Sequence, residues 1–217
     1  MSDARANILA SLRQAPVATA DLPALDFAVL TGKHWDPEER LRRLRLNMEA
    51  VKTEFLDCRD QPWPRRVAEF LQRENLPSLL YGPATAEGQA LAAGWPAAGP
   101  RLRPYDQPVE TFKAELFHDL AAGFSTTLGG IAETGGLLLT PGPLEPRLLS
   151  LVPPVHIALL RVERIFDTLH QAILALGWNR QLPPNALVIS GPSKTADIEQ
   201  TLAYGVHGPR RLLVVLI

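Results

Sequence analysis

Short apolar runs that alternate with helical segments constrain the fold of this chain more than any other feature of its sequence. The runs fall at residues 76–81, 136–140, 155–160, 186–189 and 212–217. Each has the length of a buried β-strand and is bounded by turn-forming residues. Buried strands separated by helices predict an α/β fold with a three-layer, mixed or parallel sheet.

Helical spacing of apolar residues surrounds these strands. It predicts an N-terminal helical arm at residues 2–14, a linker marked by Pro16 and Pro23, and a helix that runs from Asp36 to Phe55. Further segments with helical character lie at residues 64–73, 84–94, 112–120 and 164–176, and an edge-like strand lies at residues 101–105. We divide the chain into residues 1–74, the arm and its helices, and residues 75–217, the main α/β part, as one compact unit.

The composition excludes several classes of function. With 217 residues, 46% of them hydrophobic, the chain can bury a substantial core, and its net charge of -1 provides no positive field for nucleic acid. The N-terminus lacks the apolar stretch of a secretion signal, and no run reaches transmembrane length. We therefore expect a cytoplasmic protein that neither inserts into a membrane nor binds nucleic acid.

The metal-binding residue types are sparse. A single cysteine, Cys58, cannot supply the four thiolates that an iron–sulfur cluster normally requires, and the five histidines show no zinc-ligand spacing. We predict no intrinsic metal or cofactor. Cys58 is either a buried apolar side chain on a helix that also carries Phe55 and Leu56, or a reactive thiol, and the first interpretation is favoured.

A glycine- and threonine-rich segment, residues 126–136, is the first place where chemistry is expected. Glycines allow close backbone approach to a ligand, and threonine hydroxyls can hold a carboxylate or phosphate. Glu133 is its only ionisable group and is a candidate catalytic base or nucleophile; alternatively, Glu133 accepts hydrogen bonds and fixes the turn. The candidate ligand-binding residues here are Thr127, Gly130, Thr134 and Gly135.

A second segment, residues 189–200, follows an apolar strand. We expect a strand, a loop and then a helix with a buried stripe of Ile198, Leu202 and Val206. The loop either binds an anion or caps that helix, and it lacks the glycine spacing of an ATP-binding P-loop. Its candidate ligand-binding residues are Ser190, Gly191, Ser193, Lys194 and Thr195.

The turn at residues 204–211 adds two further candidates. Histidine side chains titrate near neutrality, so His207 is a tentative catalytic residue, and Arg210 can clamp a carboxylate. A structural role for His207 stays open. His156, which opens the strand at residues 155–160, is interpreted as structural.

Four motifs together resemble the lactate utilisation protein C family, also called the LUD domain. They are Gly130-Ile131-Ala132-Glu133-Thr134-Gly135, Pro153-Pro154-Val155-His156-Ile157, Ser190-Gly191-Pro192-Ser193-Lys194-Thr195-Ala196-Asp197-Ile198-Glu199 and Gly205-Val206-His207-Gly208-Pro209-Arg210. The resemblance covers about residues 75–217. It implies a fold like that of the ribose-phosphate isomerase, glucosamine-phosphate deaminase and CoA-transferase group.

The resemblance also implies a role in oxidising L-lactate to pyruvate, with cysteine-rich partner subunits that carry the iron–sulfur clusters. In one hypothesis the Glu133 loop and the Ser190–Thr195 loop form one pocket for a small carboxylate or phosphorylated ligand, with Arg210 orienting it and His207 or Glu133 exchanging protons. In another the chain is a noncatalytic subunit for docking or ligand sensing. A CoA-transferase-like or sugar-phosphate-isomerase-like enzyme, with Glu133 as a nucleophile, is a third alternative.

Overall fold

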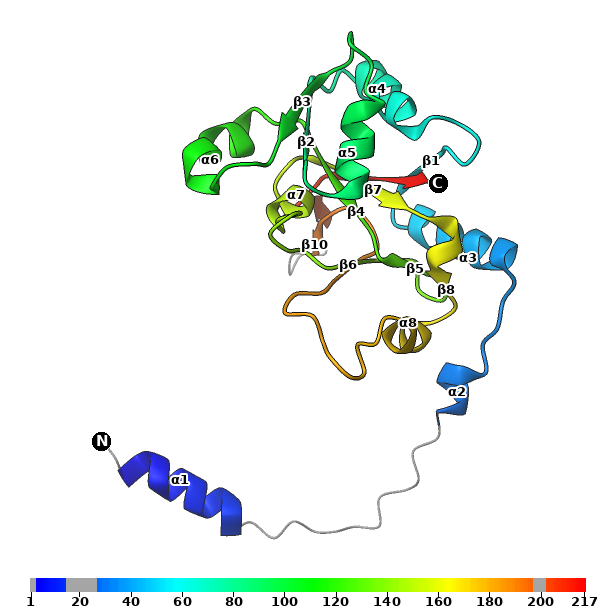
Figure 1. Cartoon of the computed structure of the whole chain (residues 1–217). Helices are drawn as coiled ribbons and strands as arrows, with labels where there is room; N and C mark the ends of the chain where they lie inside the picture. The colour runs from blue at the N-terminus through cyan, green and yellow to red at the C-terminus, as the bar shows by residue number, and fades with distance from the viewer. Residues whose placement is uncertain (1–2, 15–26, 197–201) are drawn as a thin grey trace.

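The computed structural model describes residues 3–14, 27–196 and 202–217. Its main sheet has six parallel strands in the order β1-β12-β7-β4-β2-β3 (Figure 1). The strands are β1 (Glu54–Asp57), β2 (Ser78–Tyr81), β3 (Arg101–Pro104), β4 (Ala122–Thr126), β7 (Val155–Leu160) and β12 (Arg211–Leu216). The predicted α/β fold with a parallel sheet is confirmed, whereas the finer resemblance to the isomerase, deaminase and CoA-transferase group stays a prediction.

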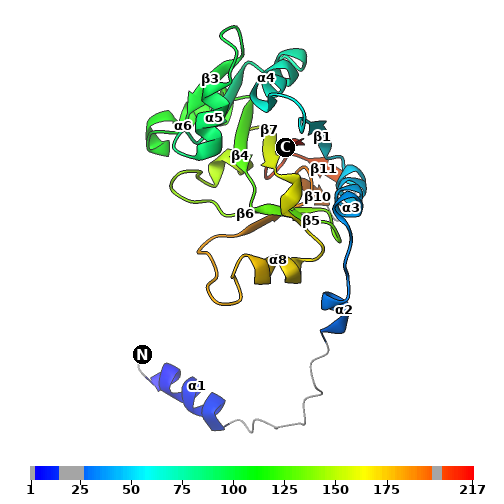
Figure 2. The ribbon, with the colours of Figure 1, turned by 45° about the vertical axis from the view of Figure 1, so that its right-hand side comes forward.

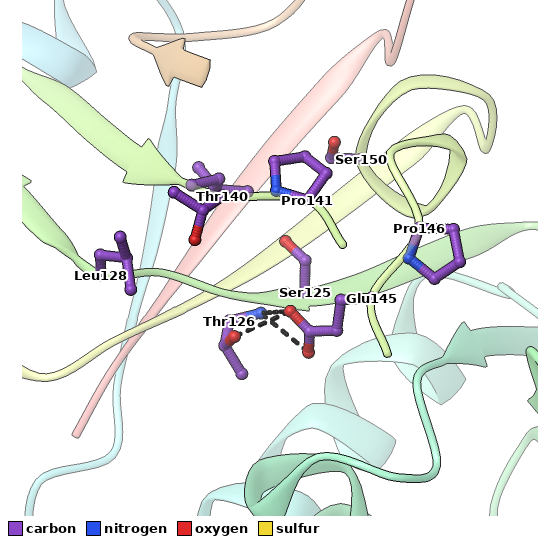
Figure 3. Close-up of a pocket in the computed structure, with 9 residues that line it drawn as sticks. Ser125, Thr126, Leu128, Thr140, Pro141, Glu145, Pro146 and Ser150 are labelled. Atoms are coloured by element: carbon purple, nitrogen blue, oxygen red, sulfur yellow. Dashed lines mark hydrogen bonds between the residues drawn. The ribbon is translucent and has the colours of Figure 1, made fainter. Parts of the chain in front are cut away.

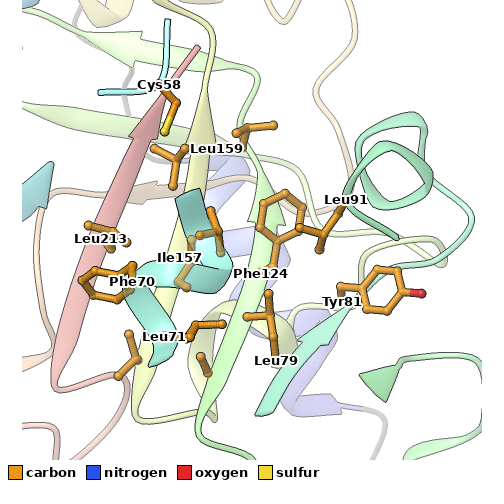
Figure 4. Packing of buried hydrophobic residues seen from close by; sticks show 14 residues of the cluster. Cys58, Phe70, Leu71, Leu79, Tyr81, Leu91, Phe124, Ile157, Leu159 and Leu213 are labelled. Atoms are coloured by element: carbon orange, nitrogen blue, oxygen red, sulfur yellow. The ribbon is translucent and has the colours of Figure 1, made fainter. Parts of the chain in front are cut away.

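Two helices cover one face of the main sheet. They are α4 (Trp63–Arg73) and α5 (Ala86–Ala93). Because side chains alternate between the two faces of a strand, Ile157 of β7 and Leu213 of β12 point to this face, where they pack with Phe70 of α4 (Figure 4). The ring of Phe124 on β4 stacks on Trp63 with centroids 5.5 Å apart. This layer is an apolar core.

The other face is covered by helices and by a second, smaller sheet. The helices are α3 (Pro37–Glu49), α6 (Val109–His118) and α7 (Leu148–Leu151), and the small sheet has the order β8-β5-β6-β9, with β5 (Gly129–Ile131), β6 (Gly136–Leu139), β8 (Ile165–Phe166) and β9 (Leu187–Ile189). Leu44 and Met48 of α3 are fully buried against Val214 of β12 and Leu137 of β6. Helix α8 (Leu169–Ala175) lies on the far side of the small sheet (Figure 1 and Figure 2).

Many predicted elements are confirmed within a few residues. Strand β7 has the predicted bounds, and α4, α5, β2, β3, β6, β9 and β12 each overlap the expected segment. The helix expected at residues 112–120 is α6, which begins at Val109. The N-terminal helix is α1 (Asp3–Gln14), which has no buried residue, and the linker with Pro16 and Pro23 lies outside the described residues.

The predicted helix from Asp36 to Phe55 is wrong at its C-terminal end. Its start is confirmed, since the Asp36 side chain accepts a hydrogen bond of 2.9 Å from the Glu39 N–H. The helix ends at Glu49, a turn with Lys52 at φ 70° follows, and Phe55 lies on β1 opposite Val214. Phe55 fits the helical spacing by coincidence. Its apolar side chain is partly buried because β1 pairs with β12.

Two further helix predictions need correction. Over residues 164–176 the chain forms β8 and a shorter helix that begins at Leu169, where the Thr168 hydroxyl accepts from the Gln171 N–H. Where a helix was expected after residue 193, β10 (Lys194–Ala196) and β11 (Leu202–Tyr204) form an antiparallel pair. Val206 is exposed, so it is no part of a buried stripe, and Ile198 lies outside the described residues.

Two further strands, β4 and β5, lie where the sequence patterns indicated no strand, and β4 shows why. In β4, Gly123 allows α7 to pass directly over the sheet, since a Cβ at this position would lie 2.1 Å from the Leu149 carbonyl oxygen. A strand of small residues carries little of the β-branched signal that sequence patterns rely on. Among the described residues, no helix is long and apolar enough to cross a membrane.

Candidate functional site

A cavity of about 150 Å³ brings three of the predicted site residues together. We call it the loop cavity. Gly191 and Ser193 of the loop after β9 form one wall, and His207 of the turn before β12 forms another. Its other lining residues are Ser150, Leu151, His156, Ile189, Gly208, Pro209 and Leu212.

Backbone hydrogen bonds fix the walls of the loop cavity. The Ser193 N–H donates to the Pro209 carbonyl over 2.8 Å, and the Gly205 N–H donates to the Ser193 carbonyl over 2.9 Å. The Arg210 N–H donates to Pro154 over 2.8 Å. These contacts join the three motifs at residues 153–157, 190–199 and 205–210, so segments that are far apart in the sequence surround one space.

His156 is the buried titratable side chain of this cavity. Its Nε2 lies 2.8 Å from Oγ of Ser125 on the neighbouring strand β4, and both side chains are buried. Burial lowers the pKa of His156 to about 4, because a charged imidazole would lose its hydration. The ring is therefore neutral at pH 7. The sequence pattern indicated a structural histidine and did not pair it with Ser125, since their contact depends on the register of β4 and β7.

Ser125, the partner of His156, lines a second, smaller cavity of about 30 Å³ (Figure 3). We call it the carboxyl-edge cavity, because it lies where β4 ends. Glu145 is its one carboxyl group; Thr126 donates to it from the backbone N–H over 3.0 Å and from the hydroxyl over 2.8 Å. The remaining lining residues are Leu128, Leu139, Thr140, Pro141, Pro146 and Ser150.

The position of Glu145 in the sheet topology is that of a ligand site. From β2 the chain continues outward to β3, whereas from β4 it continues towards β7, so the two connections diverge at neighbouring strand ends. Ligands of open α/β sheets bind at such points. Burial raises the pKa of Glu145, and the Thr126 hydrogen bonds oppose that rise. Sequence analysis missed Glu145, and its signal would have been a lone carboxylate in a proline-rich loop.

The Glu133 turn, residues 131–136 between β5 and β6, has different surroundings. Lys33 pairs with the Glu133 carboxylate, and the Glu133 N–H donates to the carbonyl of Asp167 over 3.0 Å. Asn47 of α3 donates through Nδ2 to the carbonyls of Ala132 and Glu133, both over 3.1 Å. The turn is therefore tied to α3 through its backbone carbonyls and to the segment before α3 through the Glu133 side chain. Glu133 is absent from the lining of the loop cavity.

The other residues predicted in the first segment are packing and backbone positions. Gly135 has φ +69°, and a Cβ there would lie 2.5 Å from the Cβ of Asn47. A Cβ on Gly130 would press on Leu44 of α3. Thr134 is exposed, and the Thr127 hydroxyl donates to the Leu159 carbonyl over 2.8 Å. Their ligand-binding roles stay predictions.

The remaining residues of the second segment lie around the loop cavity without lining it. Ser190 is exposed, and its carbonyl accepts from the Thr53 hydroxyl over 3.1 Å. Lys194 and Thr195 lie on β10, where Lys194 is exposed, and Arg210 is exposed after the turn. Two cationic side chains thus directly follow cavity-lining residues in the chain.

The described residues contain no group of three or more histidine, cysteine or acidic side chains that could hold a metal ion. Cys58 is buried, as predicted, although it follows a strand and not a helix. Burial raises the pKa of its thiol, which disfavours the reactive thiolate.

The sequence profile of the LUD domain matches residues 41–217. The chain belongs to the LUD domain family. The match begins within α3, so the family domain includes α3, β1 and α4 in addition to the predicted range of residues 75–217.

Relatives of this LUD domain protein span almost its full length. It is 39% identical to an uncharacterized protein of Neisseria meningitidis serogroup B over 99% of this chain and 93% of that one. It is 27% identical to Lactate utilization protein C of an Exiguobacterium species, over 83% of this chain and 78% of the relative. A crystal structure of a DUF162 family protein from Deinococcus radiodurans shares the fold, with a TM-score of 0.63, 22% identity, and coverage of 84% of this chain and 99% of that one.

Proposed function

We propose that this protein is a component of a lactate-utilisation system, that it supports the oxidation of L-lactate to pyruvate, and that the loop cavity is where it binds the small carboxylate. One observation carries the proposal: three of the four motifs that resemble the lactate utilisation protein C family line this one cavity. Relatives over most of the chain bear that name.

The loop cavity has groups that suit a carboxylate. The Ser193 hydroxyl and the His207 ring line it and can donate hydrogen bonds to carboxylate oxygens. The exposed cations Lys194 and Arg210 follow lining residues and attract an anion towards the cavity. In this proposal Ser193 and Gly191 contact the ligand, Arg210 steers it, and His207 exchanges a proton at the rim.

Oxidation of lactate to pyruvate removes two electrons and two protons from the hydroxy acid. This chain has one cysteine, and its described residues hold no metal-binding cluster, so we propose that the electrons pass to iron–sulfur clusters in cysteine-rich partner subunits. The chain itself then supplies ligand binding, orientation and proton exchange. A noncatalytic docking or ligand-sensing subunit is the alternative that the experiment must separate.

The test is lactate-dependent dye reduction by the complex reconstituted from this chain and its partner subunits. We expect activity to require this chain and to fall at least about tenfold with Ser193→Ala or His207→Gln, the scale of one lost hydrogen bond to a charged group. His118→Gln, at the end of α6 and outside the loop cavity, is the matched control. Full activity of both cavity variants, with the chain still required, would establish the docking alternative.

A further inference from the structure

The buried pair of Ser125 and His156 lies between the two cavities. His156 lines the loop cavity, Ser125 lines the carboxyl-edge cavity, and Ser150 lines both. The 2.8 Å contact between Ser125 Oγ and His156 Nε2 therefore joins them through a buried wall. Beyond Ser125, in the second cavity, is the carboxyl group of Glu145 (Figure 3).

A carboxylate that enters the loop cavity needs a positive charge close by, because burying an unpaired anion is costly. The cations Lys194 and Arg210 have exposed side chains. Arg211, next to the lining residue Leu212, already pairs with Glu54 and Glu74. The ionisable side chains among the lining residues are His156 and His207.

The polar groups that line the two cavities beside His156 come from several elements. Strand β4 presents Ser125, α7 presents Ser150, and the loop after β9 presents Ser193. The turn before β12 presents His207, and the nearest carboxyl group in the second cavity is Glu145. Among the described residues, no lysine or arginine lines either cavity, so His207 is the other side chain there that can carry a positive charge.

We propose that the loop cavity binds its monocarboxylate together with one proton, which His156 carries. The proposal rests on the proposed function and deepens it, because it specifies a small anionic carboxylic acid as the ligand. A protonated imidazole donates through both ring nitrogens. Nε2–H then donates to Ser125 Oγ, and the Ser125 hydroxyl is free to donate into the carboxyl-edge cavity. The second ring N–H serves the ligand.

The magnitudes are compatible with such proton-coupled binding. An opposite charge within hydrogen-bonding range raises the pKa of a histidine by about 1–3 units. The pKa of His156 is about 4 in the empty cavity, and the bound carboxylate raises this pKa into the mildly acidic range. A proton taken up on binding makes the affinity rise by up to about tenfold for each pH unit of acidification in that range.

The test is calorimetric titration of the whole protein with pyruvate, which stays ionised throughout the pH range used. At pH 5.5, in buffers of different ionisation enthalpy, we expect an uptake of ~0.2–0.9 proton per pyruvate bound, and affinity that falls as the pH rises to 7.5. Lactamide, the uncharged amide of lactate, is expected to take up none. The ring nitrogens of ¹⁵N-histidine-labelled protein are expected to show His156 changing from neutral to charged on pyruvate binding.

Variants separate His156 from the other imidazole of the cavity. His207→Gln is expected to weaken pyruvate binding yet keep the proton uptake, whereas Ser125→Ala, which removes the acceptor for Nε2–H, is expected to reduce the uptake at least about twofold. Ser78→Ala removes another buried hydroxyl, outside both cavities, and controls for packing. If Ser125→Ala does not fold, the ¹⁵N spectra of the histidine rings in wild-type protein still show whether His156 becomes charged on pyruvate binding.

Three outcomes are decisive. Pyruvate binding without proton uptake, or with a neutral His156 ring, overturns this inference and leaves the proposed function standing. Uptake that disappears in His207→Gln assigns the proton to the other imidazole and also overturns it. No binding of pyruvate or L-lactate overturns the proposed ligand site itself, and the inference falls with it.

Discussion

The loop cavity and the Glu133 turn are both built from glycine-containing loops that the sequence marked as candidate sites, yet the fold gives them opposite surroundings. Around His207 the backbone groups bond to one another and leave a space of about 150 Å³. Around Glu133 the polar groups bond to Lys33, Asn47 and Asp167. Glycine-rich composition therefore indicates close backbone approach, but only the fold decides whether a ligand or another helix approaches.

The largest expected effect tests how strongly the segment before α3 is tied to the Glu133 turn. Asp167 is fully buried and accepts hydrogen bonds from Arg40, from the Trp35 N–H and from Gln171. Asp167→Ala leaves Arg40 without its partner, and we expect a loss of about 3–5 kcal/mol in the free energy of unfolding. Urea denaturation measures it.

Exposed Asp60 provides the matched control, since Asp60→Ala is expected to change the free energy of unfolding by less than about 0.5 kcal/mol. A loss below about 1 kcal/mol in Asp167→Ala would show that this network contributes little, and that the Glu133 turn is not held as the hydrogen bonds indicate.

The second prediction concerns the loop-cavity side of the comparison and its pH dependence. Burial lowers the pKa of His156 from 6.5 to about 4, so the native state releases a proton that the unfolded state keeps. Stability from this group is complete above pH 6.5 and is lost as the pH falls towards 4, by up to about 3 kcal/mol. Urea denaturation of the wild-type protein at pH 7 and pH 4.5 measures the loss.

Glu145 acts in the opposite direction, since its raised pKa favours the native state as the pH falls. The two contributions are separated with His156→Asn and Glu145→Gln. His156→Asn is expected to lessen the acid-induced loss of stability, and Glu145→Gln is expected to increase it. An unchanged pH dependence in His156→Asn would contradict the buried, neutral histidine.

The third prediction tests the close approach of α3 to the Glu133 turn. Gly135→Ala forces alanine into a left-handed conformation at φ +69° and places its Cβ 2.5 Å from that of Asn47. We expect a loss of about 1–3 kcal/mol in the free energy of unfolding. Gly142→Ala is the control, because its Cβ meets open space, and it is expected to shift stability by less than about 1 kcal/mol. Equal losses in both would refute the packing argument.

Sequence patterns predicted the parts of this molecule that depend on local periodicity. The run at residues 155–160 becomes β7 with its predicted bounds, and α3 begins where a helix start was predicted, with Asp36 as its cap. Sequence patterns failed where the secondary structure of a segment depends on the strand with which it pairs. Phe55 suits a helix and a strand alike, and its pairing with Val214, far away in the sequence, selects the strand.

The residues of the candidate site show the same difference between local patterns and long-range pairing. Gly191, Ser193 and His207 were selected from turn composition, and the fold does bring them together. Ser125 and Glu145 were not selected, because a serine within an apolar stretch and a lone carboxylate between prolines are weak local signals. Their significance depends on the order of the parallel strands, which places the ends of β2 and β4 at a point where the connections diverge.

The smallest expected effect decides between the two regions as sites of chemistry. Lys33 and Glu133 form a partly exposed ion pair, and such pairs contribute about 0.2–1 kcal/mol. We expect Glu133→Gln to lose no more than this in urea denaturation and to keep lactate-dependent dye reduction in the reconstituted complex within about twofold, since Glu133 is absent from the lining of the loop cavity. Lys33→Gln, which breaks the same ion pair from its other side, should match it in both measurements. A folded Glu133→Gln protein whose activity falls more than about a hundredfold, beside an active Lys33→Gln protein, would instead assign catalysis to Glu133 and make the turn the reactive site.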